Sequence, residues 1–132
     1  MYTETIKPRF HETDAIGHIN NAVIAEWFEG ARSPIFEIFV PKISGEKVSI
    51  ILARITIDFH RETELGSNVE IKSTISRIGN SSFDVHQEVW QGGQKTASGI
   101  AVMVHFDHKT KKSIKLEGDL LEQLQKHLIA VE

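Results

Sequence analysis

The spacing of hydrophobic positions changes along the chain. Near the amino terminus Tyr2, Ile6 and Phe10 are interleaved with polar residues, which is typical of a half-buried strand, and Pro8 indicates an edge position or a bulge. From Ile24 onward apolar residues recur with the period of one helical face. They lie at positions 24, 27, 28, 31, 35 and 38. The sequence therefore predicts a strand followed by a long helix.

The predicted helix has a marked start and an interruption. Asn20 or Asn21 is suited to cap it, because either side chain can accept a hydrogen bond from a first-turn amide. Pro34 lacks the N–H that would donate to the carbonyl of Gly30. We therefore expect a kink or an early end near Ser33.

The rest of the chain alternates between strand patterns and turns. Strands are predicted over 48–60, 69–75, 83–89 and 97–106, and an amphipathic helix over 116–129. Gly79-Asn80 and Gly92-Gly93 mark two hairpin turns, and 107–113 is a further turn. The strand at 97–106 is apolar on both faces for part of its length, which favours an internal position.

These elements predict an α+β fold, with one curled antiparallel sheet wrapped around a long central helix. The whole chain, 1–132, is expected to form a single domain, since 132 residues are within the usual range for one. A sheet of this kind has an unpaired edge strand, so we expect a homodimer formed across a twofold axis.

Composition narrows the class of protein. The chain has no cysteine, which excludes disulfides and thiol nucleophiles, and its formal charge of -3 makes nucleic acid a poor candidate partner. It shows neither a signal-peptide pattern nor the roughly 18 uninterrupted apolar residues of a membrane span. We therefore expect a cytoplasmic protein that does not bind membranes.

The candidate chemistry lies in the loop at 10–21, between the first strand and the helix. The first amides of a helix have no intrahelical acceptor and carry the positive end of its dipole, so they can hold a carbonyl oxygen or an oxyanion. Asp14 precedes this helix end by a few residues. A carboxylate beside such an electrophilic pocket supplies the two parts that acyl hydrolysis needs.

Two motifs stand out in this chain: Asp14-x-x-Gly17-His18-Ile19-Asn20-Asn21 and Trp27-Phe28-Glu29-x-Ala31-Arg32. Together they resemble the signature of the 4-hydroxybenzoyl-CoA thioesterase family of hotdog-fold acyl-CoA thioesterases. Later stretches agree with it: Ile57-Asp58-Phe59, Glu62 to Gly66, Arg77 to Ser82, and Gln87-Glu88-Val89. The resemblance runs from about Thr5 to Leu116, nearly the whole chain.

The resemblance implies a five-stranded hotdog sheet and a dimer with each site at the subunit interface, with dimers pairing into a homotetramer as a further option. It assigns Asp14 as the catalytic carboxylate, either as nucleophile or as general base toward water. It assigns the backbone amide of Asn21 to polarise the thioester carbonyl. The expected substrate is an acyl-CoA, although an acyl carrier protein is a possible carrier, and no cofactor is implied beyond the coenzyme A of the substrate.

Further residues are predicted to contact the substrate. Gly17, His18 and Asn20 lie in the same loop as Asp14. By resemblance, Arg77, Ser81 and Ser82 approach the pantetheine arm and the nucleotide phosphates. Val23-Ile24 stands where the family often has a tyrosine, which favours an aliphatic acyl group.

Two other functions fit the same residues. In a hotdog dehydratase His18 would perform the acid and base steps and leave the thioester intact. In a non-catalytic acyl-CoA-binding module no thiol would be released. A metal site is not expected, because neither the trio His11, Asp14 and His18 nor the run 105–108 has the spacing of a dedicated site.

Overall fold

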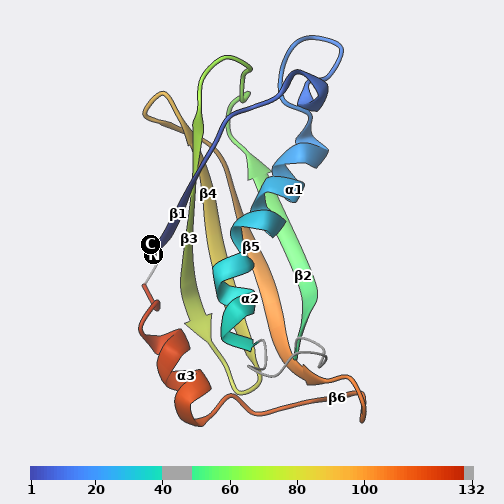
Figure 1. Cartoon of the computed structure of the whole chain (residues 1–132), viewed down its shortest axis with the longest axis vertical. Coiled ribbons are helices and arrows are strands. Elements are labelled where there is room, and N and C mark those ends of the chain that lie inside the picture. Colours follow the sequence, from blue (N-terminus) through green and yellow to red (C-terminus); the bar gives the residue numbers. More distant parts are fainter. Residues whose placement is uncertain (40–48, 130–132) are drawn as a thin grey trace.

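The computed structural model describes residues 1–39 and 49–129. Five strands form one antiparallel sheet in the order β1-β3-β4-β5-β2 (Figure 1). They are β1 (Tyr2–Ile6), β2 (Ile50–Phe59), β3 (Val69–Ile78), β4 (Ser82–Gln91) and β5 (Gln94–Asp107). A two-residue strand, β6 (Lys112–Ser113), pairs with the end of β5. The predicted internal position of the strand at 97–106 is confirmed, because β5 lies between β4 and β2.

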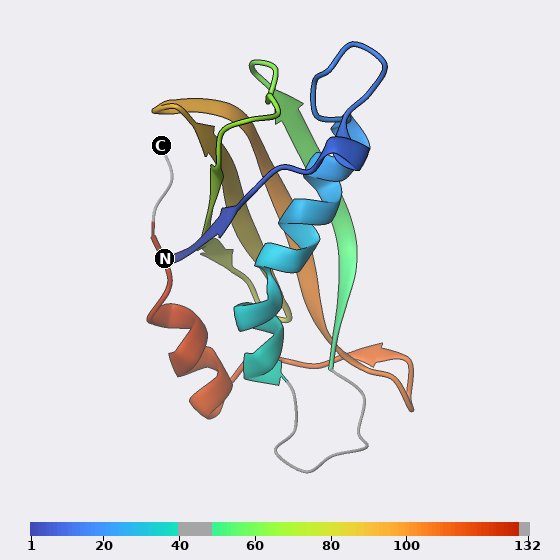
Figure 2. The same ribbon diagram turned by 45° about the horizontal axis from the view of Figure 1, so that its top comes forward.

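The helices lie on one side of this sheet. They are the 3-10 helix η1 (Phe10–Glu12), α1 (Asn21–Ala31), α2 (Ser33–Phe39) and α3 (Gly118–Gln125). In both views α1 and α2 run along one face of the curved sheet, and α3 lies beside the end of α2 that is farther from the amino terminus of α1 (Figures 1 and 2). The predicted α+β arrangement is confirmed.

The long helix is interrupted at Arg32, as Pro34 predicts. The backbone N–H of Arg32 donates to Glu29 O at 3.1 Å, and α2 begins at the next residue. The carbonyl of Phe28 instead accepts a hydrogen bond from Gln87 Nε2 at 2.8 Å. A buried side chain from β4 thus satisfies a carbonyl group at the break.

Two apolar clusters fill the space between helices and sheet. The first, the α1 cluster, consists of Ile19, Ile24, Trp27, Phe28, Ala31, Val69, Ile71, Val89 and Ala97. The second, the α2–α3 cluster, consists of Ile35, Phe39, Ile50, Ile75, Phe83, Val85, Ala101, Met103, Leu116 and Leu124. Gly99 marks a close approach of β5 to both β2 and α1, since a Cβ there would lie 2.8 Å from the carbonyl oxygen of Thr56 and 3.2 Å from the Phe28 ring.

Three predictions about element ends are wrong or only partly tested. Phe10 is not part of the first strand: β1 ends at Ile6, and Phe10 begins η1 with 81% of its surface exposed. The terminal helix ends at Gln125 instead of Ile129, because the chain turns there and the backbone of Ile129 pairs with Ile75 O at 2.8 Å. The predicted start of the third segment at Val48 lies outside the described residues.

The strand β2 forms one edge of the sheet and keeps an apolar row uncovered. Leu52, Ile55 and Phe59 pair with inward-facing residues of β5, yet 46%, 38% and 47% of their surfaces are exposed. Because α1 and α2 leave this row open to solvent, β2 offers both an unpaired edge and an apolar surface.

Candidate active site

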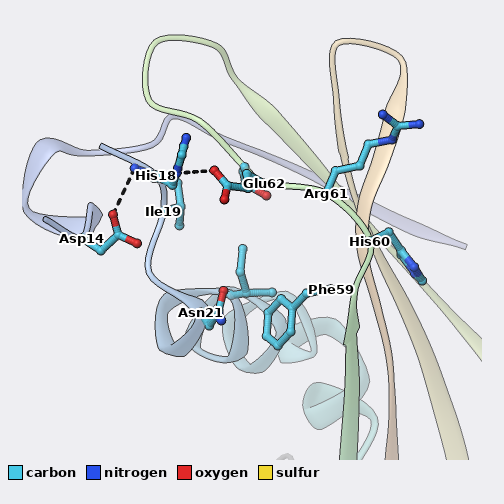
Figure 3. A pocket seen from close by; sticks show the side chains of 10 residues that line it. Asp14, His18, Ile19, Asn21, Phe59, His60, Arg61 and Glu62 are labelled. Carbon is cyan, nitrogen blue, oxygen red and sulfur yellow. Dashed lines mark hydrogen bonds and ion pairs between the residues drawn. The ribbon is translucent and has the colours of Figure 1, made fainter. Parts of the chain in front are cut away.

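The loop that connects η1 to α1 lies against the connection between β2 and β3. Between them is a cavity of about 380 Å³. It is lined by Asp14, His18, Ile19, Asn21, Ile24, Phe59, His60, Arg61, Glu62 and Thr63. The structure therefore brings together three of the predicted residues, Asp14, His18 and Asn21, at one cavity (Figure 3).

The carboxylate of Asp14 is oriented by its own loop. Its Oδ1 accepts hydrogen bonds from the backbone N–H groups of Ile16, at 3.0 Å, and His18, at 3.2 Å. The backbone N–H of Asp14 donates in turn to His18 O at 2.8 Å. Within the described residues Oδ2 has no hydrogen-bond donor, so one carboxylate oxygen is fixed and the other is available for chemistry.

Gly17 makes this tight loop possible. Its φ of +85° lies in the left-handed region, where a side chain would be strained, and its N–H donates to Asp14 O at 3.2 Å. Gly17 does not line the cavity. Its position in the site loop agrees with the prediction, while a direct contact with substrate stays a prediction.

The helix terminus supplies the second reactive group. Asn20 is the N-cap of α1, and its Oδ1 accepts from Ala22 N at 2.8 Å while its carbonyl accepts from Val23 N at 2.9 Å. Asn21 is the first residue of the helix, and within 1–39 and 49–129 its backbone N–H has no acceptor. An unpaired N–H at the positive end of α1 can hold a carbonyl oxygen as it gains negative charge.

His18 connects the two sides of the cavity. Its Nδ1 contacts Glu62 Oε2, from the connection after β2. Figure 3 shows His18 between Asp14 and Glu62, with Asn21 on the helix beyond them, while His60 and Arg61 point away from Asp14.

Further hydrogen bonds join the two segments beneath this cavity. Ile19 N donates to Thr63 O at 2.8 Å, and the buried Thr63 hydroxyl donates to Thr96 Oγ1 at 2.8 Å. Gln91 holds the same connection from β4, since it accepts from Glu64 N at 2.9 Å and donates to Glu64 O at 2.8 Å. The site loop is therefore anchored to the sheet by bonds that involve neither the Asp14 nor the Glu62 side chain.

The other predicted contacts lie elsewhere in the chain. Arg77, Ser81 and Ser82 surround the turn between β3 and β4, near the Ile50 end of β2, whereas the cavity lies at its Phe59 end. At ~3.3 Å per residue these ends are roughly 30 Å apart. Arg77 donates to Ser82 Oγ and to Asp84 Oδ1, and the hydrogen bond to Asp84 raises the pKa of Arg77. One chain therefore does not bring these three residues to Asp14.

The wall formed by Phe59 to Thr63 was not predicted as part of the site. No local sequence pattern marks these residues as part of the site, because they come next to Asp14 only through the tertiary fold. The sole pointer was the resemblance of the stretches around Ile57 to Phe59 and Glu62 to Gly66 to family motifs.

In the described part of the chain, no three histidine, aspartate or glutamate side chains are grouped so that they could hold a metal ion. None of the described helices has the length and apolar character that spanning a membrane would require.

Comparison with known proteins places this geometry in a family. The family model of the thioesterase-like superfamily matches residues 8–124. The chain belongs to the thioesterase-like superfamily. This membership confirms the predicted thioesterase class.

Individual relatives agree with the family assignment. The long-chain acyl-CoA thioesterase FadM of Escherichia coli K12 is 28% identical over 128 residues, which cover 91% of this chain and 94% of that protein. A solved predicted thioesterase from Bacillus stearothermophilus has a TM-score of 0.93 at 33% identity, covering 99% of this chain and 98% of that one. A thioesterase from Thermus thermophilus, complexed with coenzyme A and Zn, has a TM-score of 0.82 at 27% identity over 94% of this chain and 97% of that one. The hotdog fold is thereby confirmed for this thioesterase-like protein.

Proposed function

We propose that this member of the thioesterase-like superfamily hydrolyses acyl-CoA to a carboxylic acid and free coenzyme A, with Asp14 as the reactive carboxylate. The observation that carries the proposal is the joint presence of Asp14 and the Asn21 N–H on one cavity. In one form of the reaction Oδ2 attacks the thioester carbonyl, the C–S bond breaks, and water then hydrolyses the mixed anhydride. In the other form Asp14 takes a proton from the water that attacks the carbonyl, the C–S bond breaks, and the proton passes to the departing thiolate of coenzyme A.

Both forms need stabilisation of the same oxyanion. The Asn21 N–H, at the start of the eleven-residue helix α1, donates to the carbonyl oxygen as it becomes negative. One donor of this kind contributes about 2.7–4 kcal/mol to transition-state stability. A carboxylate and one helix terminus therefore account for a substantial part of the rate enhancement.

The acyl group is an aliphatic chain. Three apolar side chains line the cavity among its polar residues: Ile19, Ile24 and the half-exposed ring of Phe59. An aliphatic chain gains free energy on leaving water for contact with these side chains, at about 25 cal/mol per Å² of apolar surface buried. FadM, a relative over most of the chain, is a long-chain acyl-CoA thioesterase, which supports the same class of substrate.

The active form is a homodimer joined along β2. The support is the unpaired edge of this strand together with its exposed row of Leu52, Ile55 and Phe59. A second protomer would bring another set of Arg77, Ser81 and Ser82, which in one chain lie far from the cavity. Contacts from these three residues to coenzyme A are therefore assigned to the partner protomer.

Dimerisation is tested by introducing a charged side chain into the exposed apolar row of β2. Ile55→Lys places an ammonium group on the apolar surface and should convert a species of twice the 14.9 kDa chain mass into a monomer in sedimentation experiments. Lys substituted for Ile129, which is 42% exposed near the carboxyl terminus, is the matched control and should leave the mass unchanged. A wild-type monomer at all concentrations would contradict the homodimer.

The catalytic assignment is tested with Asp14→Asn. The asparagine Oδ1 can still accept from the two loop amides, but the side chain can neither attack the carbonyl nor take a proton. We expect kcat for thiol release to fall on the order of 10³-fold or more, with the unfolding midpoint preserved. Asp119→Asn, on the exposed first turn of α3, is the control and should keep wild-type turnover.

The outcomes separate the competing functions. Wild-type turnover by Asp14→Asn contradicts the role of Asp14. A product whose acyl chain is hydrated or dehydrated, and whose thioester is intact, indicates a dehydratase. Acyl-CoA binding without thiol release, over a panel of chain lengths and aromatic thioesters, indicates a binding module.

A further inference from the structure

The ion-pair contact between His18 and Glu62 has no role in the proposed reaction. It joins the site loop to the connection after β2, and both side chains line the cavity. The His18 Nδ1 atom is buried, although 31% of its side chain and 59% of the Glu62 side chain are exposed. An exposed pair of this kind contributes little to stability, with typical values of about 0–1 kcal/mol. Its place at the cavity therefore suggests a role other than holding the fold together.

A continuous set of contacts leads from Glu62 to the reactive carboxylate. Glu62 Oε2 contacts the Nδ1 of His18. The backbone N–H of the same histidine donates to Asp14 Oδ1 at 3.2 Å, and its carbonyl accepts from Asp14 N at 2.8 Å. Figure 3 shows the three residues side by side in this order. A shift of His18 therefore moves the group that orients Asp14.

We propose that Glu62 is a positioning residue that acts through His18 to aim the Asp14 carboxylate at the substrate. This inference rests on the proposed function for its effect on turnover. In this proposal the contact of the Glu62 carboxylate with Nδ1 fixes the orientation of the ring and keeps the ring proton on that nitrogen. The fixed ring holds the backbone N–H of His18 on Asp14 Oδ1 and leaves Oδ2 toward the carbonyl carbon.

The fold does not depend on this contact. The adjoining Ile19 N–H is bonded to Thr63 O, and Thr63 and Gln91 anchor the connection to β4 and β5. These bonds remain when Glu62 is shortened. Loss of Glu62 should therefore misplace the carboxylate without detaching the loop, and misplacement of a catalytic group by about 1 Å can cost on the order of 10²-fold in rate.

The first test compares Glu62→Ala with Glu64→Ala, an exposed carboxylate two residues on. We expect Glu62→Ala to lower kcat for thiol release about 10- to 100-fold, to leave KM within about twofold, and to preserve the unfolding midpoint. Glu64→Ala should match the wild type in all three, because only the backbone of Glu64 holds the loop. Wild-type kcat in Glu62→Ala would overturn the proposal.

The second test separates positioning from acid and base chemistry by His18. An asparagine side-chain nitrogen can take the place of Nδ1, whereas that of glutamine reaches the place of Nε2. We expect His18→Asn to keep kcat within about fivefold of the wild type, and His18→Gln to lose as much as Glu62→Ala. Equal loss in both variants, with Glu62→Ala active, would instead assign the ring an acid or base role that neither amide side chain can perform.

A third readout does not require turnover. Ring ¹⁵N NMR should place the His18 proton on Nδ1 in the wild type, and the His18 amide should exchange with solvent at least about tenfold faster in Glu62→Ala than in Glu64→Ala. If the wild type releases no thiol, the proposed function fails, but these two measurements still decide whether Glu62 orders the bond to Asp14. An unprotonated Nδ1 and unchanged amide exchange would overturn the inference.

Discussion

The two apolar clusters of the molecule share one sheet but differ in how they are closed. The α2–α3 cluster is covered by α3, whose Leu124 is fully buried. The α1 cluster ends at Ile19 and Ile24, which also line the candidate active site. The difference shows that the same curved sheet provides a sealed core at one end and the apolar floor of a reaction site at the other.

A buried polar layer separates these clusters. Gln87 accepts from Arg32 Nη1 at 3.0 Å and donates to Phe28 O and to Ser73 Oγ, at 2.8 and 3.1 Å. Burial lowers the pKa of Arg32, and the charge of Glu29 acts in the opposite direction. This layer lies where α1 ends and α2 begins, so the break in the helix coincides with the boundary between the α2–α3 cluster and the α1 cluster.

The largest expected effect is a loss of stability at the sealed end. Phe83 is fully buried and its ring stacks on Phe39 with centroids 5.4 Å apart. Phe83→Ala should lower the free energy of unfolding by about 3–5 kcal/mol, measured in urea, because the cavity it leaves cannot fully collapse. Turnover per folded molecule should not change.

Ile100→Ala is the control for this prediction. Ile100 lies on the other face of β5 and is 38% exposed, so its truncation should cost less than about 1 kcal/mol. A reduced kcat in folded Phe83→Ala would contradict the separation of the two ends.

The opposite change is expected at the active-site end of the α1 cluster, where a substitution can remove activity without loss of stability. Asn21→Pro deletes the candidate oxyanion N–H at the first helical position, where proline is well tolerated. The extended conformation of Asn20, with φ -61° and ψ 137°, also suits a residue before proline. We expect kcat to fall by a factor that corresponds to about 2.7–4 kcal/mol, with an unchanged unfolding midpoint.

Asn21→Ala is the matched control, since it removes the side chain and retains the amide. It should keep kcat within about threefold of the wild type, a difference of about 0.7 kcal/mol. Should both variants lose activity equally, the side chain of Asn21 and not its N–H would be the group that matters.

The sequence allowed the fold to be predicted where the signal is local. The Gly79-Asn80 and Gly92-Gly93 turns, the internal strand and the break near Ser33 follow from residues within a few positions of each other. The extent of the terminal helix does not, because Leu128 and Ile129 continue the apolar pattern while their backbone pairs with Ile75 in β3. A contact distant in sequence thus ended a helix that periodicity would have continued.

The same limit applies to the site. Asp14, His18 and Asn21 could be predicted because one loop carries all three. Glu62 could not be given a role, since its contact with His18 spans the length of α1, α2 and β2. The half of the cavity that comes from a single loop was therefore predictable, and the half that comes from tertiary packing was not.

An intermediate effect is expected at the boundary between the clusters. Gln87→Leu is similar in size but leaves Arg32 Nη1 and Phe28 O without their partner, both in the protein interior. We expect the free energy of unfolding to fall by about 2–3 kcal/mol in urea denaturation. Gln123→Leu, on the exposed face of α3, should change it by less than about 0.5 kcal/mol. A neutral Gln87→Leu would show that the polar layer is not needed to hold the break.

The smallest expected effect tests whether the active-site end of the α1 cluster is held by the helix cap. Asn20→Ala removes the side-chain acceptor of Ala22 N and should cost about 1 kcal/mol of unfolding free energy. Asn20→Asp, which keeps an acceptor, should restore that stability. Because the cap fixes the first turn that presents the Asn21 N–H, Asn20→Ala should also lower kcat, by less than Asn21→Pro does. A loss of stability with full activity would mean that the first turn keeps its geometry without the cap, and that Glu62, His18 and the bond from Ile19 to Thr63 are enough to hold the active-site end in place.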